Sequence, residues 1–442
     1  MRVVVAIAAG LLAGCGQASP GEPAPAAVTA AAPAKAATEA SAKAATEASA
    51  KAATEASAKA TAEASAKAAT EAPSRVVEVV ECQVTLRDAA GDDEKVTALI
   101  DAANKALVDA RFGEAWTCAD RAADLAPTSV EAHHLRGASL AGLGRTAEAQ
   151  VAYSLALALD PDDPETLRAV ADFYINGKAD RGRDGLRLGL ELAQRGSRRM
   201  LARRRKAPGL AADLALLEGQ ALDDLGRSDD AIARIDVALK HAPGRGEALH
   251  ERGVALFNLS RFPEAKAAFE RTLAIQPDDA FSHQLMGLTL EQLGDAAGAA
   301  RELARAVELA PGELSPPMLV PAAEIRREVE AILGTLPPAR RARLHEVPIE
   351  ITDLPDPADL SAVQPPFPPT ILGLYRGPVG RGPAEHDRRR GEPTSIVLYR
   401  KNLARAAKTR EELCVQIRET LLHEIGHLEG LDEDDLRRRG MD

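Results

Sequence analysis

Residues 246–279 read GEALHERGVALFNLSRFPEAKAAFERTLAIQPDD, and this stretch decides the fold of most of the chain. The small Gly253 lets a first helix pack tightly against a second one, which meets it at Ala265 and Phe269. Pro277 then ends the second helix, because proline cannot continue the helical hydrogen-bond pattern. The stretch therefore predicts one pair of packed helices.

The same pattern recurs along the chain with a fixed spacing. Equivalent prolines and glycines lie 34 residues apart: Pro127 and Pro161; Pro243, Pro277 and Pro311; Gly219, Gly253 and Gly287. This period is typical of stacked helix pairs, and here the chain resembles the tetratricopeptide repeat family. The resemblance implies a helical-repeat solenoid whose concave surface binds a protein partner.

We place these repeats at about residues 92–314. The first unit is weaker, with Ala103 where later units have the packing glycine. Pro161 and Pro243 are 82 residues apart, 14 more than two periods, which predicts a degenerate repeat with an insertion near residues 165–210. We expect this insertion to interrupt the solenoid.

The composition agrees with a mainly α-helical protein. Aromatic residues make up 3% of the 442 residues while alanine is abundant, which favours helices packed through small side chains over a β-sandwich. The length indicates two folded domains and additional non-globular sequence. A net charge of -11 argues against nucleic acid as a partner, because phosphate binding requires a surplus of Lys and Arg.

Residues 1–15 have the pattern of a lipoprotein signal peptide. Arg2 precedes a short apolar run over residues 3–12, which is typical of an export signal. Leu12-Ala13-Gly14-Cys15 resembles the lipobox of bacterial lipoproteins, and the resemblance implies that Cys15 carries a lipid. We therefore expect a cell-envelope protein anchored to a membrane by its N-terminal lipid. Gly16, in place of the aspartate of lipoproteins retained at the inner membrane, favours the outer membrane or the periplasmic face.

Residues 16–75 form a low-complexity spacer rich in Ala, Lys and Glu. From residue 35 they repeat Lys-Ala-Ala-Thr-Glu-Ala-Ser-Ala, which places Glu39 four residues before Lys43 and supports an isolated helix. A fully helical stretch over residues 35–71 would span roughly 55 Å at about 1.5 Å per residue. The spacer either holds a domain away from a membrane or is a solvated linker.

The remaining cysteines are odd in number if Cys15 is lipidated. They are Cys82, Cys118 and Cys414. In an oxidising compartment, one of them must stay unpaired within the chain. Their spacing matches neither a zinc ribbon nor a CxxC redox site, so we expect buried thiols.

The repeat period stops before residues 322–442, which predict a small α/β domain. Gly430 is expected to end its last long helix, because glycine is a common helix terminator. The expected elements are helices over residues 322–333 and 410–429 and strands over residues 347–353 and 395–400, with a short apolar stretch over residues 370–375.

The sequence His423-Glu424-Ile425-Gly426-His427 lies on that last helix. The two histidines are four residues apart, so their rings emerge on one face and can bind one zinc ion. Zinc lowers the pKa of its water ligand to about 7, and Glu424 is close enough to take the proton. Beyond Gly430 the chain can turn back, which lets Glu433 or Asp432 become the third ligand. The pattern predicts a zinc-dependent peptidase acting on a protein or peptide.

The last quarter of the chain also resembles the minimal zincin family of bacterial metallopeptidases. In that family the third ligand lies three residues after the glycine and is usually aspartate; here this position is Glu433, with Asp432 as the alternative. The resemblance is carried by Leu336-Pro337 and by residues 371–375, 396–400 and 421–436.

The same resemblance implies a substrate-binding strand. A strand that lines the cleft could pair with the main chain of an extended substrate, with little sequence preference. The residues concerned could instead form an interior strand. They are Ile396, Val397, Leu398 and Tyr399.

Two functions are compatible with these patterns. One is a membrane-tethered zinc peptidase whose repeats recruit a partner or substrate. The other is a non-catalytic envelope scaffold or adaptor that acts through its repeats. The presence of Glu424 favours the peptidase, because a domain that had lost catalysis could retain zinc without this base.

Overall fold

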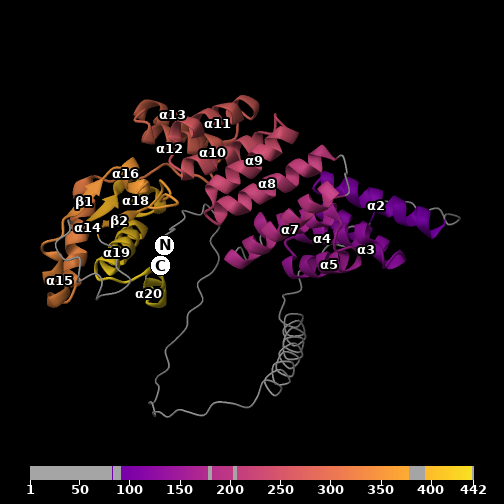
Figure 1. Ribbon diagram of the computed structural model, residues 1–442, viewed down its shortest axis with the longest axis horizontal. Helices are drawn as coiled ribbons and strands as arrows, with labels where there is room; N and C mark the ends of the chain where they lie inside the picture. The colour runs from indigo at the N-terminus through magenta and orange to yellow at the C-terminus, as the bar shows by residue number, and fades with distance from the viewer. Residues whose placement is uncertain (1–81, 83–90, 178–181, 203–206, 378–393, 441–442) are drawn as a thin grey trace, which may run out of the picture. The chain divides into compact units, whose positions relative to one another are not determined.

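Consecutive helix pairs form the repeat region (Figure 1). The computed structural model describes residues 82, 91–177, 182–202, 207–377 and 394–440. The pairs are α2 (Asp92–Val108) with α3 (Phe112–Leu125), α4 (Val130–Gly142) with α5 (Thr146–Leu159), α6 (Pro164–Ile175) with α7 (Arg183–Ala202), α8 (Pro208–Asp224) with α9 (Ser228–His241), α10 (Gly246–Asn258) with α11 (Phe262–Ile275), and α12 (Ala280–Gln292) with α13 (Ala296–Leu309).

Glycine at the predicted positions brings the two helices of a pair into contact. A Cβ atom on Gly253 of α10 would lie 2.5 Å from the ring of Phe269 on α11, which is closer than van der Waals contact allows. Gly137 of α4 meets the ring of Tyr153 on α5 in the same way, at 2.6 Å. The predicted helix contacts of these units are therefore confirmed.

The stack of helix pairs continues through the region of the expected insertion. Helix α7 packs against both α6 and α8, and a Cβ atom on its Gly196 would lie 2.8 Å from the side chain of Leu214. Helix α7 has 20 residues, whereas the second helix of each other pair has 14. The expected interruption is wrong, because the longer helix α7 buries Leu190, Ala193 and Met200 within the stack.

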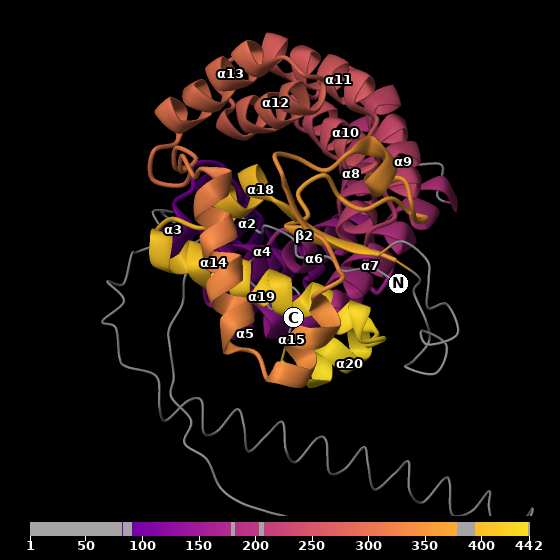
Figure 2. The ribbon, with the colours of Figure 1, turned by 90° about the vertical axis from the view of Figure 1, so that its left-hand side faces the viewer.

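A small α/β region follows the repeats and belongs to the same compact unit. Two strands lie close to the expected positions, a third lies in the apolar stretch, and α14 packs against α19 (Figure 2). The elements are α14 (Ala322–Thr335), α15 (Pro338–Leu344), β1 (Ile349–Thr352), α16 (Pro357–Leu360), β2 (Gly373–Arg376), β3 (Ser395–Tyr399), α18 (Arg400–Ala406), α19 (Arg410–Leu428) and α20 (Glu433–Arg438).

The three strands form a sheet in the order β1-β3-β2. Strand β3 pairs in parallel with β1 and antiparallel with β2, so Val397 has Glu350 on one side and Leu374 on the other. An extended substrate therefore cannot pair with β3, because both of its edges are already occupied. The expectation that residues 396–399 pair with substrate is wrong, and these fully buried residues form the interior strand that was the alternative. In the described part of the chain, β2 is the sheet edge beside α19.

Two of the three downstream cysteines form a disulfide. Cys82 and Cys118 are bonded, with their Cα atoms 5.1 Å apart, and Cys118 on α3 is fully buried beside Leu99 and Ala122. Cys414 on α19 remains a free thiol, but it is only half-buried. The expectation of buried thiols is wrong for the first two, because the fold brings residues distant in sequence within bonding reach.

Several sequence-based predictions fall outside the described residues. These are the signal peptide with Cys15, and the spacer over residues 16–75. None of the described helices combines the length and the apolar character that a bilayer crossing requires.

Candidate metal centre

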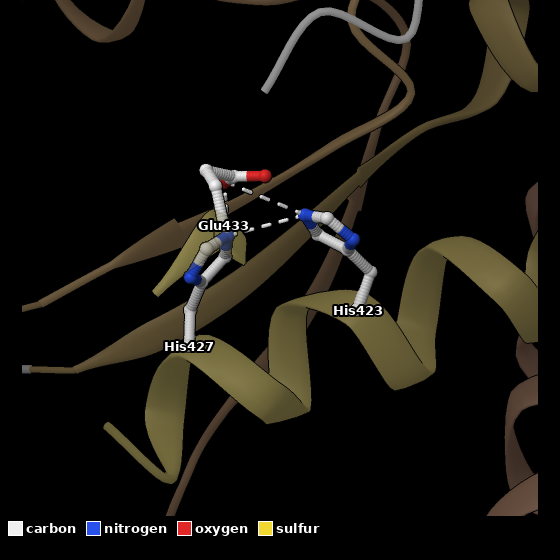
Figure 3. A group of neighbouring side chains, drawn as sticks. All are labelled: His423, His427 and Glu433. Atoms are coloured by element: carbon white, nitrogen blue, oxygen red, sulfur yellow. Dashed lines mark hydrogen bonds and ion pairs between the residues drawn. The ribbon is translucent and has the colours of Figure 1, made fainter. Parts of the chain in front are cut away.

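Helix α19 carries both predicted histidine ligands on one face (Figure 3). The helix begins after Thr409, whose hydroxyl accepts a hydrogen bond from the Glu412 amide at 3.2 Å. Its residues Leu413, Ile417, Leu421 and Ile425 are buried in the core of the α/β region. His423 and His427 are about one helical turn apart, and their Nε2 atoms lie 3.2 Å from each other.

The C-terminus of α19 turns the chain back over these rings. Gly430 has φ +82°, a conformation that glycine adopts without strain. The Gly430 amide donates to the carbonyl of His427 and the Leu431 amide to that of Gly426, each at 3.0 Å, which is a Schellman motif. The reversal brings α20 and its first residue, Glu433, to the face of α19 that carries His423 and His427.

Glu433 completes a set of three ligand atoms. Its Oε1 atom lies 3.0 Å from His427 Nε2 and 3.8 Å from His423 Nε2. Zinc bonds of about 2.1 Å in a tetrahedron place ligand atoms about 3.4 Å apart, so these separations fit one zinc ion. Among the described residues, these three form the group of His, Cys, Asp and Glu side chains that could hold a metal.

Asp432, the alternative third ligand, has a structural role in helix α20. It is the N-cap of α20, and its Oδ1 atom accepts a hydrogen bond from the Asp435 amide at 2.8 Å. The Asp435 side chain accepts in return from the Asp432 amide, which completes a capping box. Asp432 therefore orients the helix that presents Glu433, and its own carboxylate is already engaged.

This difference predicts opposite outcomes for two neighbouring substitutions. Glu433→Gln should lower zinc affinity more than about tenfold, because loss of a ligand exceeds the effect of losing a supporting hydrogen bond. Asp432→Asn should keep the affinity within about twofold, because asparagine caps helices as well as aspartate does. Competition with a chromogenic chelator measures both affinities. If Asp432→Asn lowers zinc affinity more than Glu433→Gln does, Asp432 is the third ligand and Glu433 is not.

Hydrogen bonds around the ligands set their protonation. His427 Nδ1 lies 3.1 Å from the Leu431 carbonyl, so this nitrogen carries the proton and Nε2 is available to a metal. Burial acts to raise the pKa of Glu433, but the contacts with His423 and His427 outweigh it and lower this pKa to about 2. Glu433 is thus ionised, as a metal ligand must be.

Glu424 points from the same helix toward strand β2. Its carboxylate is buried, and its Oε2 atom accepts a hydrogen bond from the Tyr375 amide at 2.7 Å. Burial raises the pKa of Glu424, although His427, His423 and this hydrogen bond act in the opposite direction. Burial and orientation of this kind are typical of a general base.

Strand β2 reaches Glu424 because residue 373 is glycine. A Cβ atom on Gly373 would lie 2.6 Å from Thr420 Cγ2 and 3.3 Å from Glu424 Cγ. The strand and α19 enclose a cleft of about 260 Å³ that contains Glu424 and all three ligands. Its other walls are mainly apolar and include Val363, Phe367, Ile371 and Leu374.

Sequence reasoning did not identify three groups in this site. The Tyr375 amide and the Leu431 carbonyl are backbone atoms, which any residue type supplies, so no residue pattern marks them. Gly373 is marked only by being a glycine within a short apolar stretch; in a strand, such a glycine can indicate close backbone approach.

Comparisons with known proteins agree with this division of the chain. Residues 344–441 match the model of a family described as zincin-like metallopeptidase. Residues 130–163 and 246–279 match models of the tetratricopeptide repeat. The chain therefore contains tetratricopeptide repeats followed by a zincin-like metallopeptidase domain.

Individual proteins that resemble this chain each cover only a part of it. The Hsp70-Hsp90 organizing protein of Triticum aestivum is 32% identical over 100 residues, which are 23% of this chain and 17% of that protein. This chain thus spans about a sixth of that relative's length. PilF of Pseudomonas aeruginosa is 16% identical over 55% of this chain and 100% of its own, with a TM-score of 0.43. PilW, a widely conserved type IV pilus biogenesis factor, is 18% identical over 49% of this chain and 94% of its own, also with a TM-score of 0.43.

Proposed function

We propose that this protein is a zinc-dependent peptidase that cleaves extended protein or peptide segments. One observation carries the proposal: the ligand atoms of His423, His427 and Glu433 lie within 4.8 Å of one another, beside the buried Glu424 and inside a cleft. Structural zinc sites are usually closed by four protein ligands. Three protein ligands next to an oriented carboxylate and an open cleft are typical of a catalytic site.

Each residue of the site has a distinct role in this proposal. Bound zinc would supply Lewis acidity toward the attacking water and the scissile carbonyl. Glu424 takes the proton from that water and passes it to the departing amine. The Tyr375 amide holds the Glu424 carboxylate in one orientation throughout, at 2.7 Å.

Strand β2 is the proposed partner of the substrate main chain. It forms the edge of the sheet in the described residues, and Gly373, Leu374 and Tyr375 line the cleft. An extended peptide that adds to this edge would gain backbone hydrogen bonds that do not depend on its sequence. The apolar walls at Val363 and Phe367 would then favour apolar side chains in the substrate.

The repeats bind a protein partner or substrate in this proposal, since tetratricopeptide repeats are protein-interaction modules. A cavity of about 430 Å³ among α2, α4 and α6 is a candidate site for this partner, and its lining includes His134, Arg168 and Asp172. We also propose a lipid anchor at Cys15, in the cell envelope. The disulfide between Cys82 and Cys118 supports an oxidising compartment, because such bonds seldom persist in the cytosol.

Metal analysis of the purified full chain tests the proposal. We expect about one zinc ion per chain, and a small fraction of that in His423→Ala, because two remaining ligands hold zinc weakly. Elemental analysis after dialysis against buffer of fixed zinc activity gives both values. Equal zinc in the two proteins would eliminate the peptidase and leave the adaptor that acts through its repeats.

A further inference from the structure

A buried carboxylate of the last repeat binds the peptidase domain. Glu291 lies on α12, and its side chain is only 8% exposed. Its Oε1 atom accepts a hydrogen bond from Lys401 Nζ at 3.0 Å, and its Oε2 atom accepts one from Arg405. Both cations lie on α18, which follows β3 directly. The repeats therefore hold a helix of the peptidase domain through one acidic side chain.

Arg405 also contacts Asn402, and so it connects Glu291 to this residue. The Nη1 atom of Arg405 donates a hydrogen bond to the Asn402 Oδ1 atom at 3.3 Å. The Asn402 amide nitrogen donates to the carbonyls of Pro369 and Ile371, at 2.9 and 2.8 Å. This arrangement fixes the amide orientation, because a flipped amide would place its oxygen against two carbonyl oxygens. Asn402 is 2% exposed, so no bulk water competes for these bonds.

The two carbonyls that Asn402 binds belong to the segment 367–371, whose ends form a wall of the cleft. Ile371 and Phe367 both line the cleft that contains the candidate metal ligands. Ile371 is also part of the buried apolar cluster that includes Phe257 and Met286 of the repeats, and Phe367 packs against this cluster. The wall is thus held by polar contacts from α18 and by apolar contacts with the repeat core.

We propose that Glu291 is a positioning residue for the peptide-binding cleft, which acts through Arg405 and Asn402 on the wall at Phe367 and Ile371. This inference rests on the proposed peptidase function and assigns the repeats a second role within it. Glu291 lies outside residues 344–441, which match the metallopeptidase family. The wall contacts the substrate and not the metal, so Glu291 acts on substrate affinity and leaves zinc binding unchanged.

The variant Glu291→Gln in the full chain tests this role by two measurements. Hydrogen exchange is read at the amides of Phe367 and Ile371, which donate to the carbonyls of Leu360 and Pro368. We expect exchange about tenfold faster at both amides. We also expect KM for a fluorogenic peptide to rise about tenfold with kcat within about twofold and zinc content unchanged. The matched control is Glu302→Gln, which removes a carboxylate that binds His283 within the repeats and should change neither measurement.

A double variant distinguishes the positioning role of Glu291 from the destabilisation that an unpaired Arg405 guanidinium would cause by itself. In Glu291→Gln with Arg405→Met the largely buried, unpaired guanidinium is gone, while Lys401 is 30% exposed and can be solvated. A purely electrostatic defect should therefore be largely relieved. The positioning role instead predicts that exchange and KM remain raised, because the Asn402 oxygen then lacks the hydrogen bond from Arg405. Protection restored in the double variant, or unchanged in Glu291→Gln, would overturn the proposal. Hydrogen exchange tests the positioning role of Glu291 even if no test peptide is cleaved. A failure to cleave any test peptide would instead count against the proposed peptidase function.

Discussion

Glu424→Gln is expected to lower kcat/KM about a thousandfold and to leave zinc content unchanged. A positioned general base contributes about 10²- to 10⁴-fold to the rate, and glutamine cannot accept the proton. The substituted side chain keeps an oxygen for the Tyr375 amide, which donates to Glu424 at 2.7 Å. The site should therefore keep its geometry while it loses its base. Cleavage of a casein-like substrate, together with elemental analysis of zinc, measures both effects.

The matched control for this variant is Glu330→Gln. Glu330 is an exposed residue of α14 in the same domain, and its substitution changes the net charge by the same amount. Its activity should equal that of the unmodified protein. If the Glu424→Gln and Glu330→Gln proteins cleave casein equally fast, Glu424 is not the base, and any remaining activity must come from another group.

The local patterns of the sequence predicted the elements well. The 34-residue period placed the helix pairs, because each pair buries its small residues against its own partner, as Gly253 does against Phe269. The spacing of His423 and His427 placed both rings on one face, because a helix fixes the geometry of residues four positions apart. These predictions depend on contacts within about one repeat or one helical turn.

The errors concern contacts between residues that are distant in sequence. Strand β3 was expected to face the substrate, but the pairing order of the sheet makes β2 the edge, and no local pattern encodes that order. The disulfide joins Cys82 to Cys118, 36 residues away, across a stretch that gives no spacing motif. Each of these outcomes requires the assembled fold.

Loss of the disulfide is expected to destabilise the first repeat by about 4 kcal/mol. A bond that closes a loop of 36 residues restricts the unfolded chain by about this amount in the chain-entropy model. The variant with Cys82→Ala and Cys118→Ala should show this loss in a denaturant titration. Cys414→Ala is the control, because it removes the cysteine that is free in the described structure and should not change the stability of this repeat.

This destabilisation should remain local, because each repeat contacts mainly its neighbours. The chain has one tryptophan, Trp116, and it lies on α3 together with Cys118. Its ring contacts the guanidinium of Arg145 in the next repeat, 4.7 Å from the ring centroid. Tryptophan fluorescence therefore reports the first repeat, whereas far-ultraviolet circular dichroism reports all the helices. In the double cysteine variant, the fluorescence transition should move to lower denaturant concentration while most of the circular dichroism transition stays in place. If the two signals move together, the repeats unfold as one cooperative unit with the disulfide region, and the first repeat supports the others.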